Sequence, residues 1–336
     1  MIHLKNKNLS KSFLIFLIIL GFISMAAFYP AEMLADKKKI QVELFGGFSN
    51  LNPSDLNLMV EADIHNQSFF YDDYHRYLET NDEIYSWSSS TEGKLKKIKD
   101  TYPLGGRLKF YLNKSMALSL GFKYMSKKES SNYMFEYIRD TYNNGTLYIE
   151  RKEFSPYILS TRGFTLLIGA HFKKELTGSI ELEGYLSGGP LIAKCKYAAY
   201  WDSQWIYRVI RENQDYFMYL SDGSLEKNGK GTGFVLDGGI RVNLNVGKKI
   251  GFFIESGYAY QVVNNVSGEG REERDNVIDT WEGDWGIIEV NIVAPWGQKR
   301  YEYATNMWEQ PEAQKIRDFK LDLSGFQLRV GIYYIF

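Results

Sequence analysis

Charged side chains recur at alternate positions within short apolar segments of this 336-residue chain. A β-strand sends alternate side chains to opposite faces, so residues at this spacing share one face and can form ion pairs there. Five are basic and five acidic: Glu43, Arg107, Lys109, Lys123, Glu181, Glu183, Asp237, Arg241, Glu255 and Arg329. The spacing predicts a balanced, structural network of ion pairs.

Motifs for catalysis or cofactor binding are missing from the sequence. The chain has no Gly-x-Ser-x-Gly turn, no His-Glu-x-x-His helix and no Walker loop. His65 and His75 lie near Ser68, Asp72 and Asp73, which are residue types that transfer protons, but they belong to a tyrosine-rich segment typical of a solvated loop. We predict no catalytic residue, no metal site and no cofactor.

A further set of residues is basic only. The set lies near the ends of the apolar segments and comprises Lys94, Lys96, Lys97, Lys99, Lys127 and Lys128, with Lys194 and Lys196 after the segment at 180–186. Ammonium groups bind phosphate as point charges, so these lysines are candidate ligands for phosphate groups. The alternative interpretation is a solvated, charged rim.

Composition restricts the elements that can position these residues. Aromatic residues make up 16% of the chain, with 30 Gly and 7 Pro, and this composition favours β-strands. The formal net charge of −1 provides no positive field for nucleic acid, so we expect no nucleic-acid partner. Cys195 is the only cysteine, which excludes an internal disulfide.

The first 35 residues have the order of a secretory signal peptide. Lys5, Lys7 and Lys11 precede an apolar run at 13–23, and small residues follow it, with cleavage predicted after Ala26 or Ala35. An uncleaved anchor is the alternative, but the run is shorter than the roughly 20 residues that a spanning helix needs. We therefore predict a signal peptide at 1–35 and one β-domain at 36–336.

Eight segments alternate strictly between apolar and polar residues. The predicted strands lie at 40–48, 104–112, 116–124, 164–172, 180–186, 234–244, 250–260 and 326–336. Three connections are short and polar, whereas those at 49–103, 128–163, 190–233 and 261–325 are long. Short turns at one end and long loops at the other are typical of an antiparallel up-and-down transmembrane β-barrel.

Turn residues within the long connections predict additional hairpins. Asn143-Asn144-Gly145, Ser221-Asp222-Gly223 and Pro295-Trp296-Gly297 each follow strand-like residues. We therefore expect several strands to continue past the barrel into a β-ribbon or crown. The third hairpin keeps a ten-stranded barrel as an alternative to eight strands.

The charged face of these strands cannot face lipid, because a charge at the bilayer midplane costs about 2–4 kcal/mol. We therefore expect the ten charged residues in the lumen and the apolar residues outside. Aromatic residues at the strand ends predict two girdles: Phe48, Tyr124, Phe164, Phe234, Tyr258 and Tyr260 at one level, and Phe110, Phe172, Tyr334 and Phe336 at the other. The rival is a soluble barrel with the two faces exchanged.

The last strand resembles the C-terminal assembly signal of outer-membrane barrels. Its apolar face consists of Phe326, Leu328, Val330, Ile332, Tyr334 and Phe336. With the strand number, the chain resembles the small bacterial outer-membrane β-barrel superfamily of OmpA-like and OmpX-like proteins, although its outer loops are longer. The resemblance implies a place in the bacterial outer membrane, among lipid and lipopolysaccharide, and recognition by the barrel-assembly machinery. The lysine set would then contact lipopolysaccharide.

Three functions follow from this architecture as expectations. The first is a structural or surface-interaction role, in which long extracellular loops bind an extracellular ligand or protein. The tryptophans expected to be exposed there are Trp201, Trp205, Trp281, Trp285, Trp296 and Trp308. The second is a narrow pore for small solutes, and the third is a lipid-A-modifying enzyme.

Overall fold

The computed structural model describes residues 40–67, 76, 84–93, 95–141, 147–209, 217–295, 297–306 and 315–336. The predicted signal peptide lies outside these ranges. The described elements are β1 (Ile40–Asn50), α2 (Ser54–Gln67), β2 (Ile84–Gly93), β3 (Asp100–Thr101), β4 (Leu104–Tyr111), β5 (Met116–Thr141), β6 (Leu147–Thr177), β7 (Ile180–Val209), β8 (Phe217–Asn245), β9 (Ile250–Asn264), β10 (Ser267–Arg274), β11 (Val277–Ala294), β12 (Gly297–Asn306), β13 (Lys315–Asp318), β14 (Lys320–Asp322) and β15 (Gly325–Ile335). Among the described residues, no helix is long and apolar enough to span a membrane.

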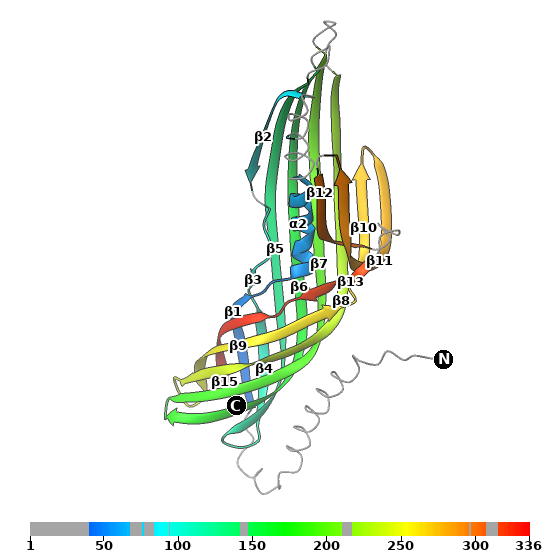
Figure 1. Ribbon diagram of the computed structural model, residues 1–336. Coiled ribbons are helices and arrows are strands. Elements are labelled where there is room, and N and C mark those ends of the chain that lie inside the picture. Colours follow the sequence, from blue (N-terminus) through cyan, green and yellow to red (C-terminus); the bar gives the residue numbers. More distant parts are fainter. Residues whose placement is uncertain are drawn as a thin grey trace, which may run out of the picture.

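Eight strands close into an antiparallel barrel at one end of the molecule (Figure 1). The order around the ring is β1-β4-β5-β6-β7-β8-β9-β15, and β15 pairs back with β1. These strands contain the eight segments predicted from alternation, so the eight-stranded barrel is confirmed. The ten-stranded alternative is wrong, because β11 and β12 form a hairpin that lies outside the ring, beside β10 and β13.

Four strands of the ring continue far beyond it. β5, β6, β7 and β8 contain 26, 31, 30 and 29 residues, and their extensions form a tall curved sheet (Figure 1). β2 pairs with β5 at one edge of this sheet, and β10 pairs with β8 at the other. We call the described residues within 49–103, 128–163, 190–233 and 261–325 the crown. The predicted extension of several strands into the long connections is thus confirmed.

The crown has a hydrophobic core of its own. α2 begins at Ser54 and places Leu56, Met59 and Val60 on one face, where each is at most 2% exposed. They pack in one cluster with residues from the tall sheet and the last connection, among them Leu159, Leu191, Cys195, Val263, Trp285, Ile287 and Phe319. A long loop is predicted at 49–103, but Leu56, Met59 and Val60 lie at helical spacing and pack against an apolar face of the sheet.

Two of the three predicted hairpins are present and the third is absent. β5 pairs with β6 and β11 pairs with β12, as expected, although the predicted turn residues Asn143-Asn144-Gly145 and Trp296 lie outside the described residues. The turn predicted at Ser221-Asp222-Gly223 is wrong, because β8 runs through these residues while it pairs with β7 and reaches β10. Gly223 leaves space for the Trp201 ring, since a Cβ at position 223 would lie 2.3 Å from that ring.

The two faces of the barrel wall differ in polarity. On β15, Leu328, Val330 and Ile332 are 44–55% exposed, whereas the alternate residues Gln327 and Arg329 are fully buried. Of the ten predicted girdle residues, Phe234 is half-buried, and the others are 37–69% exposed: Phe48, Tyr124, Phe164, Tyr258, Tyr260, Phe110, Phe172, Tyr334 and Phe336. Apolar side chains therefore face outward and charged side chains face inward, so the rival soluble barrel is wrong.

Candidate functional site: the charged lumen

Strand register places unlike charges side by side around the lumen. Glu183 on β7 lies opposite Arg241 on β8, Arg241 lies opposite Glu255 on β9, and Glu255 lies opposite Arg329 on β15. The four residues form one inward row that alternates in sign across four neighbouring strands. Opposite charges at directly paired positions stabilise the pairing of strands.

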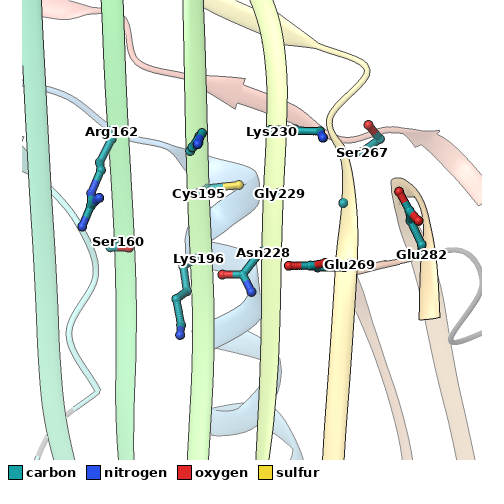
Figure 2. A pocket seen from close by; sticks show the side chains of 12 residues that line it. Ser160, Arg162, Cys195, Lys196, Asn228, Gly229, Lys230, Ser267, Glu269 and Glu282 are labelled. Carbon is teal, nitrogen blue, oxygen red and sulfur yellow. The ribbon is translucent and has the colours of Figure 1, made fainter. Parts of the chain in front are cut away.

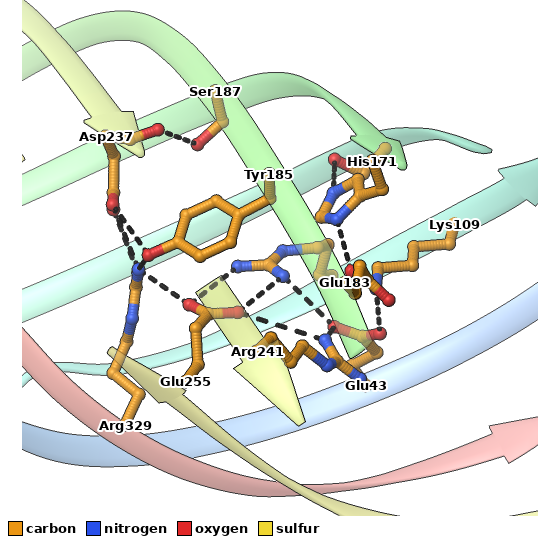
Figure 3. A network of polar contacts seen from close by, with 12 residues as sticks. Glu43, Lys109, His171, Glu183, Tyr185, Ser187, Asp237, Arg241, Glu255 and Arg329 are labelled. Atoms are coloured by element: carbon orange, nitrogen blue, oxygen red, sulfur yellow. Dashed lines mark hydrogen bonds and ion pairs between the residues drawn. The ribbon is translucent and has the colours of Figure 1, made fainter. Parts of the chain in front are cut away.

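Glu43 on β1 connects the opposite walls of the lumen (Figure 3). Its Oε2 accepts hydrogen bonds from Nη1 of Arg241 at 2.7 Å and from Nη1 of Arg107 at 3.3 Å. Its Oε1 lies 3.0 Å from Nζ of Lys109, which in turn donates to Oε1 of Glu183 at 2.5 Å. These contacts join charged residues of β1, β4, β7 and β8 across the barrel.

Asp237 on β8 is the centre of a second group. Its Oδ1 and Oδ2 each accept a hydrogen bond from Arg329 at 2.9 Å, and Oδ2 also accepts one from Nζ of Lys123 at 3.1 Å. Arg329 reaches Oε1 of Glu255 at 2.6 Å, and Glu255 reaches Arg107 at 3.1 Å. The two groups are therefore one connected network.

Aromatic rings fill the space between the ions. The Tyr185 ring lies 5.6 Å from the Arg107 guanidinium and 5.4 Å from that of Arg329, which is within range of cation–π attraction. Tyr185 fits because Gly239 and Gly257, which are opposite each other on β8 and β9, lack side chains. A Cβ at either glycine would approach the phenolic oxygen to 2.8 or 2.4 Å.

The network is sealed from water. Its charged members are each at most 5% exposed: Glu43, Arg107, Lys109, Lys123, Glu183, Asp237, Arg241, Glu255 and Arg329. Toward the crown, the inward positions become apolar at Leu167, Leu191, Val235 and Val263, each at most 3% exposed. Side chains therefore fill the lumen, as expected for eight strands, and the apolar layer covers its crown end.

Two predicted inward residues have local roles. Glu181 lies apart from the network, since it pairs with Lys173 at 3.0 Å near the turn between β6 and β7. His171 is 2% exposed, with Nδ1 2.6 Å from Glu183 and Nε2 2.8 Å from Ser119. Both histidine nitrogens thus have hydrogen-bond partners within the lumen.

The six apolar residues of the C-terminal pattern lie on the outer face of β15, where they are 37–69% exposed: Phe326, Leu328, Val330, Ile332, Tyr334 and Phe336. This placement suits contact with lipid. Their role as an assembly signal stays a prediction.

The lysines that were predicted to hold phosphate differ in their surroundings. Lys97 forms an ion pair with Glu61 on α2, and Lys127 pairs with Asp100 at 2.5 Å and Glu129 at 3.0 Å. The hydrogen bond to Asp100 raises the pKa of Lys127. Lys97 and Lys99 border a recess beside α2, Lys96 and Lys128 are exposed, and Lys94 lies outside the described residues. Lys97 and Lys127 thus have acidic partners, and contact of the set with lipopolysaccharide stays a prediction.

The tryptophans that were expected on the surface differ in exposure. Trp285 is 1% exposed and packs edge-on against Phe319 at 5.2 Å, so the expectation that it faces partners is wrong. It lies in the crown core because β11 brings it against the last connection. Trp201 and Trp281 are half-buried, and Trp296 and Trp308 lie outside the described residues.

An eight-stranded ring that is apolar outside and charged inside has the architecture of a transmembrane β-barrel. The fold is of the outer-membrane barrel type. No protein-family model and no curated protein matches the sequence.

Solved structures with similarity to the chain are outer-membrane proteins. A major outer membrane protein from Thermus thermophilus has 11% identity and a TM-score of 0.31, with 89% of this chain and 99% of that chain covered. OprG from Pseudomonas aeruginosa has 12% identity and a TM-score of 0.28, with 89% and 97% covered. The outer membrane protease OmpT from Escherichia coli has 8% identity and a TM-score of 0.30, with 90% and 97% covered. Similarity this slight carries no argument about function, and the narrower OmpA-like affiliation stays a prediction.

Sequence reasoning missed two parts of this arrangement. One is α2, whose signal was available in Ser54 before Leu56, Met59 and Val60. The other is the apolar layer above the ions, where inward positions such as Leu191 and Val235 change from charged to apolar along one strand. Val235 lies within the strand predicted at 234–244, whereas Leu191 lies in a connection predicted as a long loop, so the layer that they form was not recognised.

Proposed function

We propose that this protein is a closed outer-membrane β-barrel that anchors its crown at the bacterial surface for interaction with an extracellular ligand or protein. The proposal rests on the polarity of the ring, which is apolar outside and charged inside, the reverse of a water-soluble protein. Outward residues such as Leu328 and Val330 are about half exposed, whereas inward Glu255 and Arg329 are fully buried. Lipid is the solvent that suits this distribution, because it surrounds apolar side chains without cost and excludes charge.

The sealed lumen supports an anchor in preference to a pore. Solute passage would require ions such as Glu43 and Arg241, 2.7 Å apart, to separate inside a closed cylinder. The cost of leaving a buried charge without its partner opposes that movement. The crown, by contrast, has its own core and presents the outward face of a large sheet, which suits recognition.

Site-directed labelling tests the location and the orientation together. In a Cys195→Ala background, Asp222→Cys places a thiol on the exposed crown and Lys248→Cys places one on an exposed short turn. A membrane-impermeant maleimide should label only the first on intact cells and both after lysis. The matched turn variant excludes leaky cells as the explanation.

Heat-modifiable gel mobility of the extracted protein completes the test. The folded barrel should migrate differently from the boiled chain. A mature protein that is monomeric in water without detergent would overturn the proposal, as would labelling of Lys248→Cys alone on intact cells.

A further inference from the structure

Three cations stand side by side on the outward face of the crown. Arg162 on β6 lies opposite Lys194 on β7, and Lys194 lies opposite Lys230 on β8. All three are exposed. Neighbouring strands lie about 4.8 Å apart, so three positive charges occupy a short line across the sheet. We call Arg162, Lys194 and Lys230 the basic rung.

Two neighbouring cations of the crown have acidic partners. Lys196 pairs with Glu226 at 2.8 Å, and Arg271 pairs with Glu273 at 2.7 Å. Within the described residues, the basic rung makes no ion pair. Like charges at directly paired positions destabilise a sheet. An anion from outside the chain would relieve this repulsion.

The position of the basic rung along the strands, relative to the barrel, indicates the source of that anion. One outward position closer to the barrel, β6 and β7 carry Phe164 and Ile192, which are paired, 41% and 54% exposed, and lie at the level of the aromatic girdle. Two strand residues cover about 7 Å. If the barrel spans the membrane as proposed above, the basic rung lies just above the hydrocarbon, at the level of the lipid phosphates.

The basic rung borders a shallow recess of about 330 Å³, which is also lined by Asn228, Glu269 and Glu282 (Figure 2). The two glutamates are opposite each other on β10 and β11, and Glu269 is also opposite Asn228 on β8. Carboxylate and amide oxygens accept hydrogen bonds from hydroxyl groups. A simple phosphate would use only the cations, whereas a phosphorylated sugar would use both sides of the recess.

We propose that this recess binds the phosphorylated sugar head group of a glycolipid in the outer leaflet. The basic rung holds a phosphate: Arg162 donates through its planar guanidinium, and Lys194 and Lys230 act as point charges. Glu269 and Glu282 accept hydrogen bonds from sugar hydroxyls. The inference rests on the proposed membrane orientation and adds a lipid class to it.

A charge-matched comparison tests the phosphate contact. The triple variant Arg162→Gln, Lys194→Gln, Lys230→Gln removes the basic rung. The control Lys114→Gln, Lys174→Gln, Lys248→Gln removes three exposed charges near the short turns at the opposite end of the barrel. Binding of fluorescent bisphosphorylated lipid A is measured by anisotropy in zwitterionic detergent at low ionic strength. We expect about 100-fold weaker binding for the first variant, since each cation near a lipid surface contributes about fivefold, and less than twofold for the control. Equal affinities of the two variants would overturn the inference.

Competitors distinguish the sources of phosphate. Inorganic phosphate and phosphatidylglycerol should displace lipid A only at much higher concentrations, because neither offers the sugar hydroxyls. Displacement by inorganic phosphate at concentrations equal to lipid A would show a free-phosphate site and exclude the lipid. Glu269→Ala with Glu282→Ala should lower the preference for lipid A over phosphatidylglycerol, and an unchanged preference would exclude the sugar contact.

Heat-modifiable mobility separates the two proposals. Variants that fold as barrels but bind lipid A as the wild type does would overturn only the lipid site. A wild-type chain that does not form a membrane barrel would overturn the proposed function itself. If the triple variant fails to fold, Lys194→Gln alone removes the central charge, and we expect a loss of about fivefold.

Discussion

Asp237→Asn tests whether charge balance holds the lumen together. Asp237 is fully buried and accepts hydrogen bonds from Arg329 at 2.9 Å and from Lys123 at 3.1 Å. After the substitution, Arg329 keeps Glu255 at 2.6 Å, but Lys123 keeps only neutral amide oxygens, that of Gln327 at 3.4 Å and the one that Asn retains. Lys123 thus becomes a buried cation without a carboxylate.

The expected loss in free energy of unfolding is about 3–5 kcal/mol, which is typical of removing one partner from a buried ion pair. Asn has nearly the volume of Asp, so the loss reflects charge and not a cavity. Asp222→Asn, the same change at an exposed position of the same strand, should cost about 0–1 kcal/mol. Adding Lys123→Met to Asp237→Asn removes the orphan charge and should recover about 2 kcal/mol or more.

Guanidinium unfolding in detergent micelles, followed by tryptophan fluorescence, measures these differences. Heat-modifiable mobility verifies that each variant starts as a barrel. A loss below about 1 kcal/mol for Asp237→Asn would refute the reasoning. A double variant that loses the sum of the two single losses would refute it equally, because the two residues would then not be coupled.

Other predictions concern the crown, the lumen and the cysteine. Asp55 accepts hydrogen bonds from Arg317 at 2.6 and 2.9 Å and from the Lys320 backbone N–H at 2.8 Å. Asp55→Ala should therefore speed proteinase K cleavage of the crown roughly tenfold, as expected for a charge-assisted pair, without changing the gel mobility of the barrel. The control is Lys315→Gln, which removes an exposed pair with Asp318. Equal cleavage rates for the two variants would contradict the role of Asp55. The sealed lumen predicts planar-bilayer recordings without discrete conductance steps, and regular steps from wild-type protein would show that the ions part. Burial raises the pKa of the Cys195 thiol to about 12, so a maleimide at pH 8 should label it only in denaturant; labelling of the folded protein would place Cys195 outside the core.

Local patterns predicted the barrel well because the property that defines it is local. Alternate residues of a strand face opposite solvents, so the apolar face of Leu328, Val330 and Ile332 and the polar face of Gln327 and Arg329 can be read from spacing alone. The same alternation located all eight ring strands. Turn residues were less reliable: the sequence at 221–223 favours a turn in isolation, but strand pairing with β7 determines its conformation.

By itself, the sequence determined the eight ring strands and which face of each is charged, since period-two alternation needs no knowledge of neighbours. The exclusion of a ten-stranded ring came only from the pairing of β11 with β12 outside the ring. The tertiary structure alone decided which ions meet, because Glu43 and Arg241 are 198 residues apart and come together only when the ring closes. It also placed α2 and Trp285 in a common core and brought the three cations of the basic rung together, without an ion pair among the described residues. These outcomes depend on strand register and on segments from opposite ends of the chain, which no local pattern contains.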